Sequence, residues 1–434
     1  MKSNWTTKKM PQVVKWGSGG TPKATIKEYY ENGNIPWLII GDLNDDVVLS
    51  SESYITTKGL ENSSAKMIPI GTLLVAMYGS IGKLGITGIE CCTNQAIAFA
   101  KELYGVTTKF MYYQMKYLKP KLVSMGKGGT QKNISQTVLN SLDVIVPPID
   151  EQKRIVAKIE ELFSKLDNGV AKLNKIKEQL KIYRQAVLKA AFEGKLTKDK
   201  RINKDLHSLY QYIMERNATR FHSEDIELYD LPNGWIWVNI GNLTDRVEYG
   251  SSKKSQNTGL VPVLRMGNIQ NGVFDWSDLV YSSDSDEINK YLLKENDVLF
   301  NRTNSPELVG KSAIYIGRKK AIFAGYLIRI NQYKEINAKY LNYYLNSFMA
   351  KKYGNMVKTD GVNQSNINGR KLCSYPFPLC TVEEQELVVS EIESRLSVCD
   401  KIEQTVNETL QKAESLRQSI LKQAFEGELY NEEE

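Results

Sequence analysis

Three polar loops that contain glycine carry the side chains best suited to binding a ligand. Their sequences are SMGKGGTQKN at 124–133, FNRTNSPELVGKS at 300–312 and MVKTDGVNQSN at 356–366. Glycine lets a backbone approach a ligand closely, while lysine, arginine and amide side chains can contact phosphates and base edges. The alternative is that these loops are ordinary polar turns. Because the first and third share Gly, Gln, Asn and Ile in the same order, we favour a nucleic-acid ligand.

No combination of residues in the sequence predicts catalysis. A Ser–His or Cys–His nucleophile needs a well-placed histidine, and the two histidines, His207 and His222, both lie in a charged linker. Gly310-Lys311-Ser312 has the end of a phosphate-binding P-loop, but Ser305 stands where its first glycine is required. Val146-Pro147-Pro148-Ile149 has the prolines of an amino-methyltransferase turn without its flanking polar and aromatic residues. We expect a non-catalytic chain that binds no metal and no cofactor.

The composition is that of a soluble protein with reduced cysteines. The chain has 434 residues, of which 25% are charged, and a formal net charge of +7. Its five cysteines include no CxxC pair, which argues against a zinc site or a disulfide framework. No apolar run reaches the ~20 residues of a membrane span, and the N-terminus lacks the apolar core of a signal peptide. We therefore expect a cytoplasmic protein without contact to a membrane.

A long internal repeat determines how these loops are positioned. RQAVLKAAFEGKL at 184–196 and RQSILKQAFEGEL at 417–429 are identical at nine of thirteen positions and lie 233 residues apart. EQKRIVAKIE at 151–160 likewise matches EQELVVSEIE at 384–393, and WGSGG at 16–20 matches YGSSK at 249–253. A repeat of this length indicates two tandem copies of one domain type and not a short-period solenoid.

Each copy changes from a mixed pattern to a helical one. Short apolar runs such as LIIGDL and GTLLVAMYG, interrupted by Gly and Asn, predict strands and turns. From Glu151 onward, apolar residues recur every seven positions, which predicts a long helix capped by a left-handed Gly194. The first stripe is Ile159, Leu166, Leu173, Leu180 and Val187, with Leu162, Ile176 and Tyr183 as companions three residues later. The second is Ile392, Cys399, Val406, Ala413 and Ile420, with Ile402 and Leu416 as companions.

An amphipathic helix cannot bury such a stripe alone, so the two helices are expected to pack antiparallel. The fold class is therefore α+β, with two similar globular domains separated by two long antiparallel coiled-coil helices in pseudo-two-fold symmetry.

In layout and motifs, the sequence resembles the specificity subunits of type I restriction–modification systems over essentially its whole length. The shared features are the duplicated layout, the GxxQxNI loop, the EQxxI start of each helix and its RQxxLxxAFEGxL end. The resemblance implies the following organisation: target-recognition domain 1 at 1–149, a central helix at 150–196, a linker with a short helix at 197–230, target-recognition domain 2 at 231–381, and a C-terminal helix at 382–430.

Function and partners follow from the same resemblance. Each domain would read one half of a bipartite double-stranded DNA target, and the helices would set the spacer. Two methyltransferase subunits would dock on this chain and supply S-adenosylmethionine chemistry. Two translocase–nuclease subunits using ATP and Mg²⁺ would join them for restriction. The rival interpretations are a DNA-independent coiled-coil scaffold and a stand-alone DNA-modifying enzyme.

The resemblance assigns the helix residues more directly than the DNA-binding residues. The expected helix seam and partner contacts are Glu151, Gln152, Ile159, Leu166, Leu173, Leu180, Phe192, Glu384, Gln385, Ile392, Val406, Leu416, Ile420 and Phe425. The candidate DNA-binding residues are Lys83, Lys127, Gln131, Lys132, Asn133, Lys253, Lys254, Arg302, Asn304, Lys358, Gln364 and Asn366. The competing interpretation is that the Gln/Asn loops brace their modules, and that the helix ends pack only within the chain.

The arginines are unevenly distributed between the two copies. None occurs before Arg154, whereas the second globular domain has six, including Arg302. Arginine makes the commonest bidentate contact with guanine, so the first half-site is expected to depend less on guanine.

Overall fold

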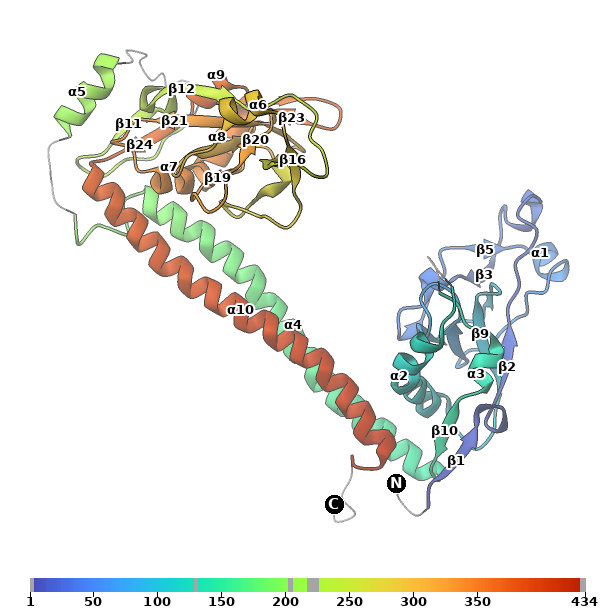
Figure 1. Ribbon diagram of the computed structural model, residues 1–434. Coiled ribbons are helices and arrows are strands. Elements are labelled where there is room, and N and C mark those ends of the chain that lie inside the picture. Colours follow the sequence, from blue (N-terminus) through green and yellow to red (C-terminus); the bar gives the residue numbers. More distant parts are fainter. Residues whose placement is uncertain (1–3, 129–131, 202–205, 217–225, 430–434) are drawn as a thin grey trace. The chain divides into compact units, whose positions relative to one another are not determined.

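The computed structural model describes residues 4–128, 132–201, 206–216 and 226–429, which form two compact units. The first unit comprises Met1–Asn174 and Asn407–Glu434, and the second comprises Lys175–Val406. Each unit combines one globular module with stretches of both long helices (Figure 1). The last stretch of the second long helix therefore packs with the first module and not with the second.

A five-stranded sheet forms the centre of the first module. Its order is β2-β9-β6-β7-β4, and its strands are β2 (Val14–Ser18), β4 (Val47–Val48), β6 (Leu73–Ala76), β7 (Leu84–Thr87) and β9 (Ile97–Leu103). All four side chains of β6 are buried, as expected for a strand covered on both faces. Helix α2 (Thr108–Met125) packs on this sheet through residues at helical spacing, among them Phe110, Met111, Met115 and Leu122.

Smaller elements complete the first module. They are the sheet of β3 (Ile35–Leu38), β5 (Tyr54–Ile55) and β8 (Cys92–Thr93), the pair β1 (Thr6–Lys9) and β10 (Asp143–Val146), and the helices α1 (Thr57–Glu61) and α3 (Gln136–Asn140). The β1–β10 pair joins the N-terminal strand to the residues just before the long helix.

The second module repeats this arrangement. Its main sheet has the order β12-β21-β17-β19, formed by β12 (Thr244–Tyr249), β17 (Val298–Asn301), β19 (Ser312–Ile314) and β21 (Leu327–Gln332). Its counterpart of the β3 sheet is β16 (Val280–Ser282), β13 (Val261–Leu264) and β20 (Ile322–Phe323), and its counterpart of β1–β10 is β11 (Ile236–Asn239) with β24 (Pro376–Leu379). β13 pairs in parallel with β20, as β3 does with β8. The predicted duplication is therefore present in the strand order itself.

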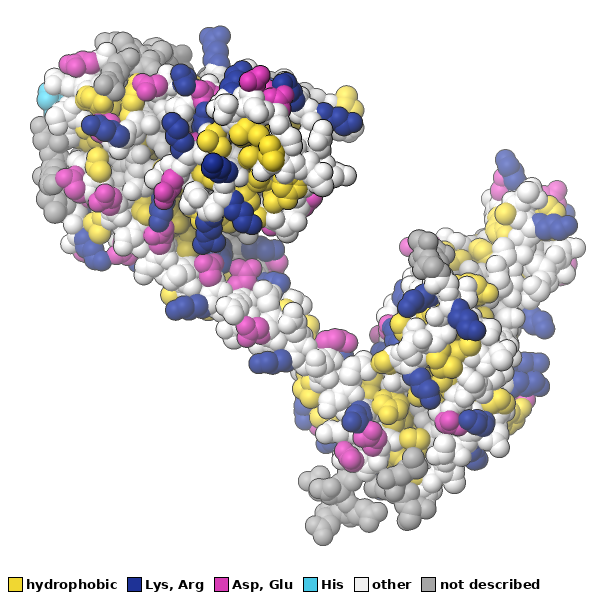
Figure 2. Space-filling model, in the orientation of Figure 1, with side chains coloured by type: hydrophobic (Ala, Val, Ile, Leu, Met, Phe, Trp, Pro, Cys, Tyr) yellow, Lys and Arg dark blue, Asp and Glu magenta, His cyan; other side chains and the backbone are white. Residues whose placement is uncertain are grey.

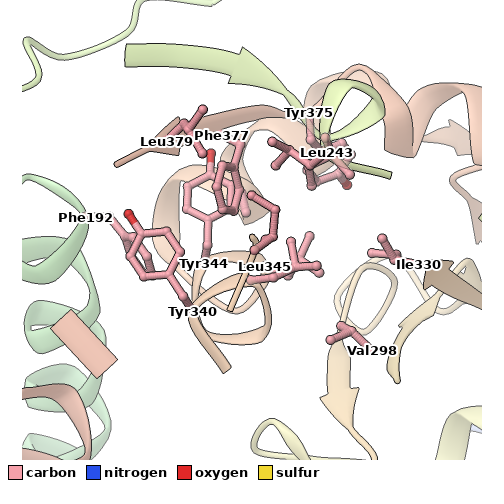
Figure 3. Close-up of a cluster of buried hydrophobic side chains, with 14 of the residues drawn as sticks. Phe192, Leu243, Val298, Ile330, Tyr340, Tyr344, Leu345, Tyr375, Phe377 and Leu379 are labelled. Carbon is pink, nitrogen blue, oxygen red and sulfur yellow. The ribbon is translucent and has the colours of Figure 1, made fainter. Parts of the chain in front are cut away.

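The remaining elements of the second unit are short. The strands are β14 (Ile269–Gln270), β15 (Val273–Phe274), β18 (Thr303–Asn304), β22 (Thr359–Asp360) and β23 (Ser365–Asn366). The helices are α5 (His207–Arg216), α6 (Ser285–Tyr291), α7 (Ala338–Leu345), α8 (Phe348–Val357) and α9 (Gly369–Cys373). α5 is the short helix expected in the linker. The core beside α7 contains a cluster of aromatic rings, in which the Phe192 centroid lies 5.1 Å from Tyr340 and 5.2 Å from Tyr344 (Figure 3).

The long helices are α4 (Ile149–Phe192) and α10 (Val382–Glu426), and they run antiparallel within each unit. In the first unit, an early stretch of α4 clusters with a late stretch of α10, and Arg417 forms an ion pair with Asp167. In the second unit, Arg184 lies 2.7 Å from Asp400 and 2.9 Å from Glu403. Arg184 and Arg417 are repeat equivalents, as are Asp167 and Asp400, so both units use the same pair.

Left-handed glycines end both helices. Gly194 has a φ of 68° and Gly427 a φ of 83°, which confirms the cap predicted for Gly194. The Lys195 amide donates to the Ala190 carbonyl at 2.8 Å, and the Glu428 amide donates to the Gln423 carbonyl at the same distance.

The seam between the helices follows the first predicted stripe, whereas among the predicted companions Leu162 and Ile176 are partly buried and Tyr183 and Ile402 are exposed. Ile159, Leu180, Ile392, Val406 and Ile420 are buried, and Leu166 and Leu173 are partly buried. The assignment of Leu416 to the seam was wrong, because its side chain is 48% exposed. The companion stripe lies four residues after the first one and not three, and it holds Phe163, Arg184, Leu396 and Arg417 at buried or partly buried positions. Because this stripe contains Arg184 and Arg417, a search for recurring apolar residues does not find it in the sequence.

A buried ion pair fastens the segment after α4 to the start of α10. The side chains of Arg201 and Glu384 are only 14% and 7% exposed, and Arg201 Nε lies 3.1 Å from Glu384 Oε1. Thr197 Oγ1 donates to the same carboxylate oxygen at 2.6 Å, and Arg201 also stacks on Trp235. The first repeat differs here, since Glu151 accepts a hydrogen bond from Asn4 at 3.2 Å.

Glu384→Ala is expected to lower the free energy of unfolding of the second unit by about 3–5 kcal/mol, because it leaves Arg201 buried without its carboxylate. The measurement is urea unfolding followed by tryptophan fluorescence. Glu391→Ala is the control, because its partner Lys200 is 61% exposed and such pairs contribute about 1 kcal/mol or less. Equal losses in the two variants would contradict the importance of the buried pair.

Candidate nucleic-acid interface

Two buried isoleucines fix the candidate loops to the ends of the central strands. The Ile134 amide donates to the Met77 carbonyl just after β6, and the Ile367 amide donates to the Arg302 carbonyl just after β17, each at 2.8 Å. Both side chains are buried, at 3% and 0% exposed. The residues before each isoleucine are therefore held at the same place on both modules.

The first-module surface, which we define as Tyr78, Lys127, Lys132 and Asn133, gathers around this point. Lys127 and Asn133 exchange both backbone hydrogen bonds, at 3.0 and 2.8 Å, and the Gly79 amide donates to the Lys132 carbonyl. The side chains of Lys127, Lys132 and Asn133 are exposed, and Tyr78 is 46% exposed. Gln131 lies outside the described residues.

The second-module surface, defined as Tyr249, Arg302, Asn304, Gln364 and Asn366, occupies the equivalent place. β18 pairs with β23, which brings Asn304 opposite Ser365 and Thr303 opposite Asn366. Asn366 Nδ2 donates to Thr303 Oγ1 at 2.7 Å, so this amide has a bracing role. The Arg302 guanidinium lies over the Tyr249 ring, 4.9 Å from its centroid, while Gln364 is exposed. The structure thus brings four predicted residues together beside one tyrosine.

Other predicted lysines have partners within the chain. Lys83 Nζ donates to the carbonyls of Ile40 and Gly41 at 3.3 and 3.4 Å. Lys358 is 14% exposed and donates to the Pro306 carbonyl at 3.2 Å, which suits a structural role better than a DNA contact. Lys253 and the exposed Lys254 follow β12 near Gly325. The Asp284 carboxylate, 2.6 Å from Lys253 Nζ, raises the pKa of that ammonium group.

Two buried glutamines join each module to its long helix. Gln152 donates to the carbonyls of Gly105 and Pro147 at 2.8 and 2.9 Å and accepts from the Thr107 amide at 2.9 Å. Gln385 donates to the carbonyls of Glu335 and Cys380 at 3.3 and 3.0 Å and accepts from the Asn337 amide at 2.8 Å. Thr107 caps α2 and Asn337 caps α7.

The side chains predicted to bind partners at the helix ends are packed against other residues of the same chain. Gln152 and Gln385 are fully buried, and Phe425 packs at 5.4 Å from both Phe110 and Tyr117. Phe192 is buried among Tyr340 and Tyr344. These contacts favour the alternative that the helix ends pack only within the chain.

A groove recurs at the base of each module, beside the glutamine. The groove in the first unit measures about 360 Å³ and is lined by Thr107, Thr108, Lys109, Lys153, Val156, Ala157 and Glu160. The groove in the second unit, of about 500 Å³, is lined at the matching positions by Asn337, Ala338, Lys339, Glu386, Val389, Ser390 and Glu393. The ion pairs Lys109–Glu160 and Lys339–Glu393, at 2.8 and 2.7 Å, are equivalent as well.

Among the described residues there is no cluster of His, Cys, Asp and Glu side chains that would hold a metal ion. All five cysteines are free thiols, and burial raises the pKa of Cys91 and Cys92 to about 12. Within the same part of the chain, no helix is long and apolar enough to cross a membrane.

Charge is distributed over both modules, with Asp and Glu between the Lys and Arg side chains (Figure 2). Tyr78 and Tyr249, which were not predicted from the sequence to belong to the interface, border the candidate loops. Tyr249 belongs to the YGSSK block of the repeat, which was its only signal in the sequence. Arginine, lysine and amide side chains next to an exposed aromatic ring suit phosphate and base contacts.

Comparisons with known proteins agree with this geometry. The family model described as "Type I restriction modification DNA specificity domain" matches residues 2–181 and 232–412, one match to each repeat. The specificity subunit of the type I restriction enzyme EcoKI from Escherichia coli (strain K12) is 26% identical over 414 residues, covering 92% of this chain and 84% of that protein. The StySPI specificity subunit from Salmonella potsdam is 25% identical, covering 99% of this chain and 90% of that protein.

Solved structures show the same fold. A chain from the structure described as "Structural basis underlying complex assembly and conformational transition of the type I R-M system" superposes with a TM-score of 0.71 at 16% identity, covering 98% of this chain and 99% of that one. The HsdS subunit from Thermoanaerobacter tengcongensis superposes with a TM-score of 0.54, also at 16% identity, covering 99% and 98% of the two chains. The prediction of a non-catalytic specificity subunit is confirmed by the family match and the named relatives. This chain belongs to the DNA specificity family of type I restriction–modification systems.

Proposed function

We propose that each module binds one half of a bipartite double-stranded DNA target through its loop surface. The observation that carries this proposal is the pair of loops fixed by Ile134 and Ile367 at the same point of both modules. Such loops can vary in sequence while their position on the sheet stays constant. Phosphate contacts would come from exposed lysines such as Lys127, Lys132 and Lys254, and base contacts from the loop amides and Arg302.

The catalytic chemistry would belong to partner subunits. The methyltransferase subunits would bind S-adenosylmethionine, and the translocase–nuclease subunits would use ATP and Mg²⁺ in the cytoplasm. The solved chain that superposes with a TM-score of 0.71 is described in terms of complex assembly of a type I system, which supports partners of this kind.

Methylome sequencing of a host that expresses this chain with its cognate methyltransferase tests the DNA-reading function. The expected result is a bipartite motif with N6-methyladenine in both halves, absent from a host that lacks this chain. The purified complex should also bind that motif with an affinity that falls steeply with salt. A soluble, active complex that produces no chain-dependent motif would favour the scaffold alternative.

The duplicated grooves support docking of two identical methyltransferase subunits, one on each unit. Seven lining positions correspond between the two grooves, and three of them carry the same residue type, namely Lys109/Lys339, Val156/Val389 and Glu160/Glu393, while Lys153 is replaced by Glu386. Each groove combines a buried valine, Val156 or Val389, with a lysine–glutamate pair at its rim. An apolar floor with a charged rim is typical of protein interfaces.

Ala157→Arg and Ser390→Arg test this docking proposal, because both side chains are exposed and a large cation would fill the groove. Each single variant is expected to retain one methyltransferase subunit, and the double variant none, as measured by native mass spectrometry. Lys172→Arg, at an exposed position of α4 outside both grooves, should retain two. Two bound subunits on the double variant would place the docking site elsewhere.

A further inference from the structure

We infer that Arg302 reads a guanine in the half-site bound by the second module, with Tyr249 holding the guanidinium in position. This inference rests on the proposed function, because it names the base that the second-module surface recognises.

The backbone of Arg302 is fixed on both sides. Its amide donates to the Tyr326 carbonyl at 3.0 Å, and its carbonyl accepts from the Ile367 amide at 2.8 Å. Arg302 therefore sits at the junction of β17 with the loop held by Ile367. An arginine in this position has little backbone freedom to lose on binding.

The side chain is oriented as well. The guanidinium carbon lies 4.9 Å from the Tyr249 ring centroid, and the Tyr249 hydroxyl accepts from the Gly369 amide at 2.8 Å, which fixes the ring. Arg302 Nη1 makes one long hydrogen bond, 3.4 Å from the Gly325 carbonyl, and Nε is shielded from solvent without a partner. A guanidinium has five N–H donors, so most of its hydrogen-bonding capacity remains for a ligand.

The other arginines of this module lack this combination of features. Arg246, Arg265 and Arg329 form ion pairs with carboxylates, at 2.6, 3.0 and 2.5 Å. Arg318 and Arg370 are exposed and, within the described residues, stack on no aromatic ring. The Arg302 guanidinium is stacked on a fixed tyrosine ring and, within the described residues, forms no ion pair with a carboxylate.

Guanine fits this arrangement better than a phosphate does. A planar guanidinium held by an aromatic ring matches the two acceptors O6 and N7 of guanine in the major groove. The neighbours Asn304 and Asn366 on the second-module surface are neutral amides, which suit base edges. The position equivalent to Arg302 in the first module is Met77, which is 5% exposed, so this arginine–tyrosine pair exists in one module only.

The test measures binding of the full methyltransferase complex to its own target, identified by methylome sequencing. Each guanine of the second half-site is replaced in turn by 7-deazaguanine, which lacks the N7 acceptor. For the unsubstituted chain, one replacement is expected to weaken binding markedly. Arg302→Ala is expected to weaken binding to the intact target about 5- to 150-fold and to become insensitive to that same replacement.

Matched variants separate base reading from charge and from misfolding. Arg318→Ala removes the same charge at an exposed position in the turn after β19 and should retain the sensitivity to 7-deazaguanine. Arg302→Lys keeps the charge but lacks the planar guanidinium, and it should lose part of the discrimination with only a small loss of non-specific binding. Every variant should still lose affinity when the whole first half-site is scrambled, which reports that the complex is assembled.

Three outcomes would overturn the inference: a second half-site without guanine, an Arg302→Ala chain that keeps its sensitivity, or an equal loss of affinity for all sequences, as a phosphate contact predicts. If the unsubstituted complex does not distinguish its target from scrambled DNA, the proposed function itself fails.

Discussion

Inserting four residues at the same level of both α4 and α10 is expected to lengthen the spacer between the half-sites by one to two base pairs. Four helical residues add about 6 Å, and one base pair adds about 3.4 Å. The site of insertion lies between the pairs Asp167–Arg417 and Arg184–Asp400, so both pairs are kept. Coiled coils accommodate a four-residue insertion by local unwinding. Methylome sequencing reads out the spacer of the altered chain directly.

Insertion into α4 alone is the control for this experiment. It would lengthen the distance along α4 between Asp167 and Arg184 by about 6 Å while the distance between Asp400 and Arg417 on α10 stays the same, so the two ion pairs could no longer form together. We expect such a chain to give little soluble complex and no new motif. An unchanged spacer in the double insertion, with an active complex, would show that the helices do not set the spacing.

Gln152→Ala and Gln385→Ala are expected to destabilise their own units by about 3 kcal/mol or more each. Each amide satisfies three backbone groups around a fully buried side chain, and an unsatisfied buried group costs about 1–3 kcal/mol. The helix cap at Thr107 or Asn337 loses its link to α4 or α10 at the same time. Hydrogen exchange followed by mass spectrometry would locate the weakened unit.

The two glutamine substitutions are also expected to affect recognition of different half-sites. Gln152→Ala should impair methylation that depends on the first half-site, and Gln385→Ala that of the second. Gln179→Ala, at an exposed position of α4, is the matched control and should change stability by less than about 0.5 kcal/mol. A uniform effect of both substitutions on the whole molecule would contradict two separately supported modules.

The repeat made most of this fold predictable from sequence. Blocks at a constant offset predicted two equivalent modules, and the seven-residue spacing predicted the antiparallel helices, because both are periodic properties of the chain. The glycine cap at Gly194 was predictable for a local reason, because a left-handed backbone conformation favours glycine.

The helix seam and the interface were harder to predict from the sequence. Arg184 and Arg417 lie in the companion stripe, and hydrophobic periodicity cannot identify a seam position occupied by a charged residue paired across the helices. The roles of Lys83 and Lys358 depend on carbonyls supplied by distant residues, which no local pattern reveals. The stacking of Arg302 on Tyr249 joins residues 53 positions apart, through sheet pairing and not through spacing.

The first unit is built from both ends of the chain, which affects how the protein folds during synthesis. The core of the first module includes Ile420, Leu421, Ala424 and Phe425, which are translated only after the whole second module. While the second module is translated, Phe110 and Tyr117 of the nascent first module therefore lack their contact with Phe425. A chain that stops before α10 leaves this apolar surface of the first module exposed, and such a patch favours aggregation.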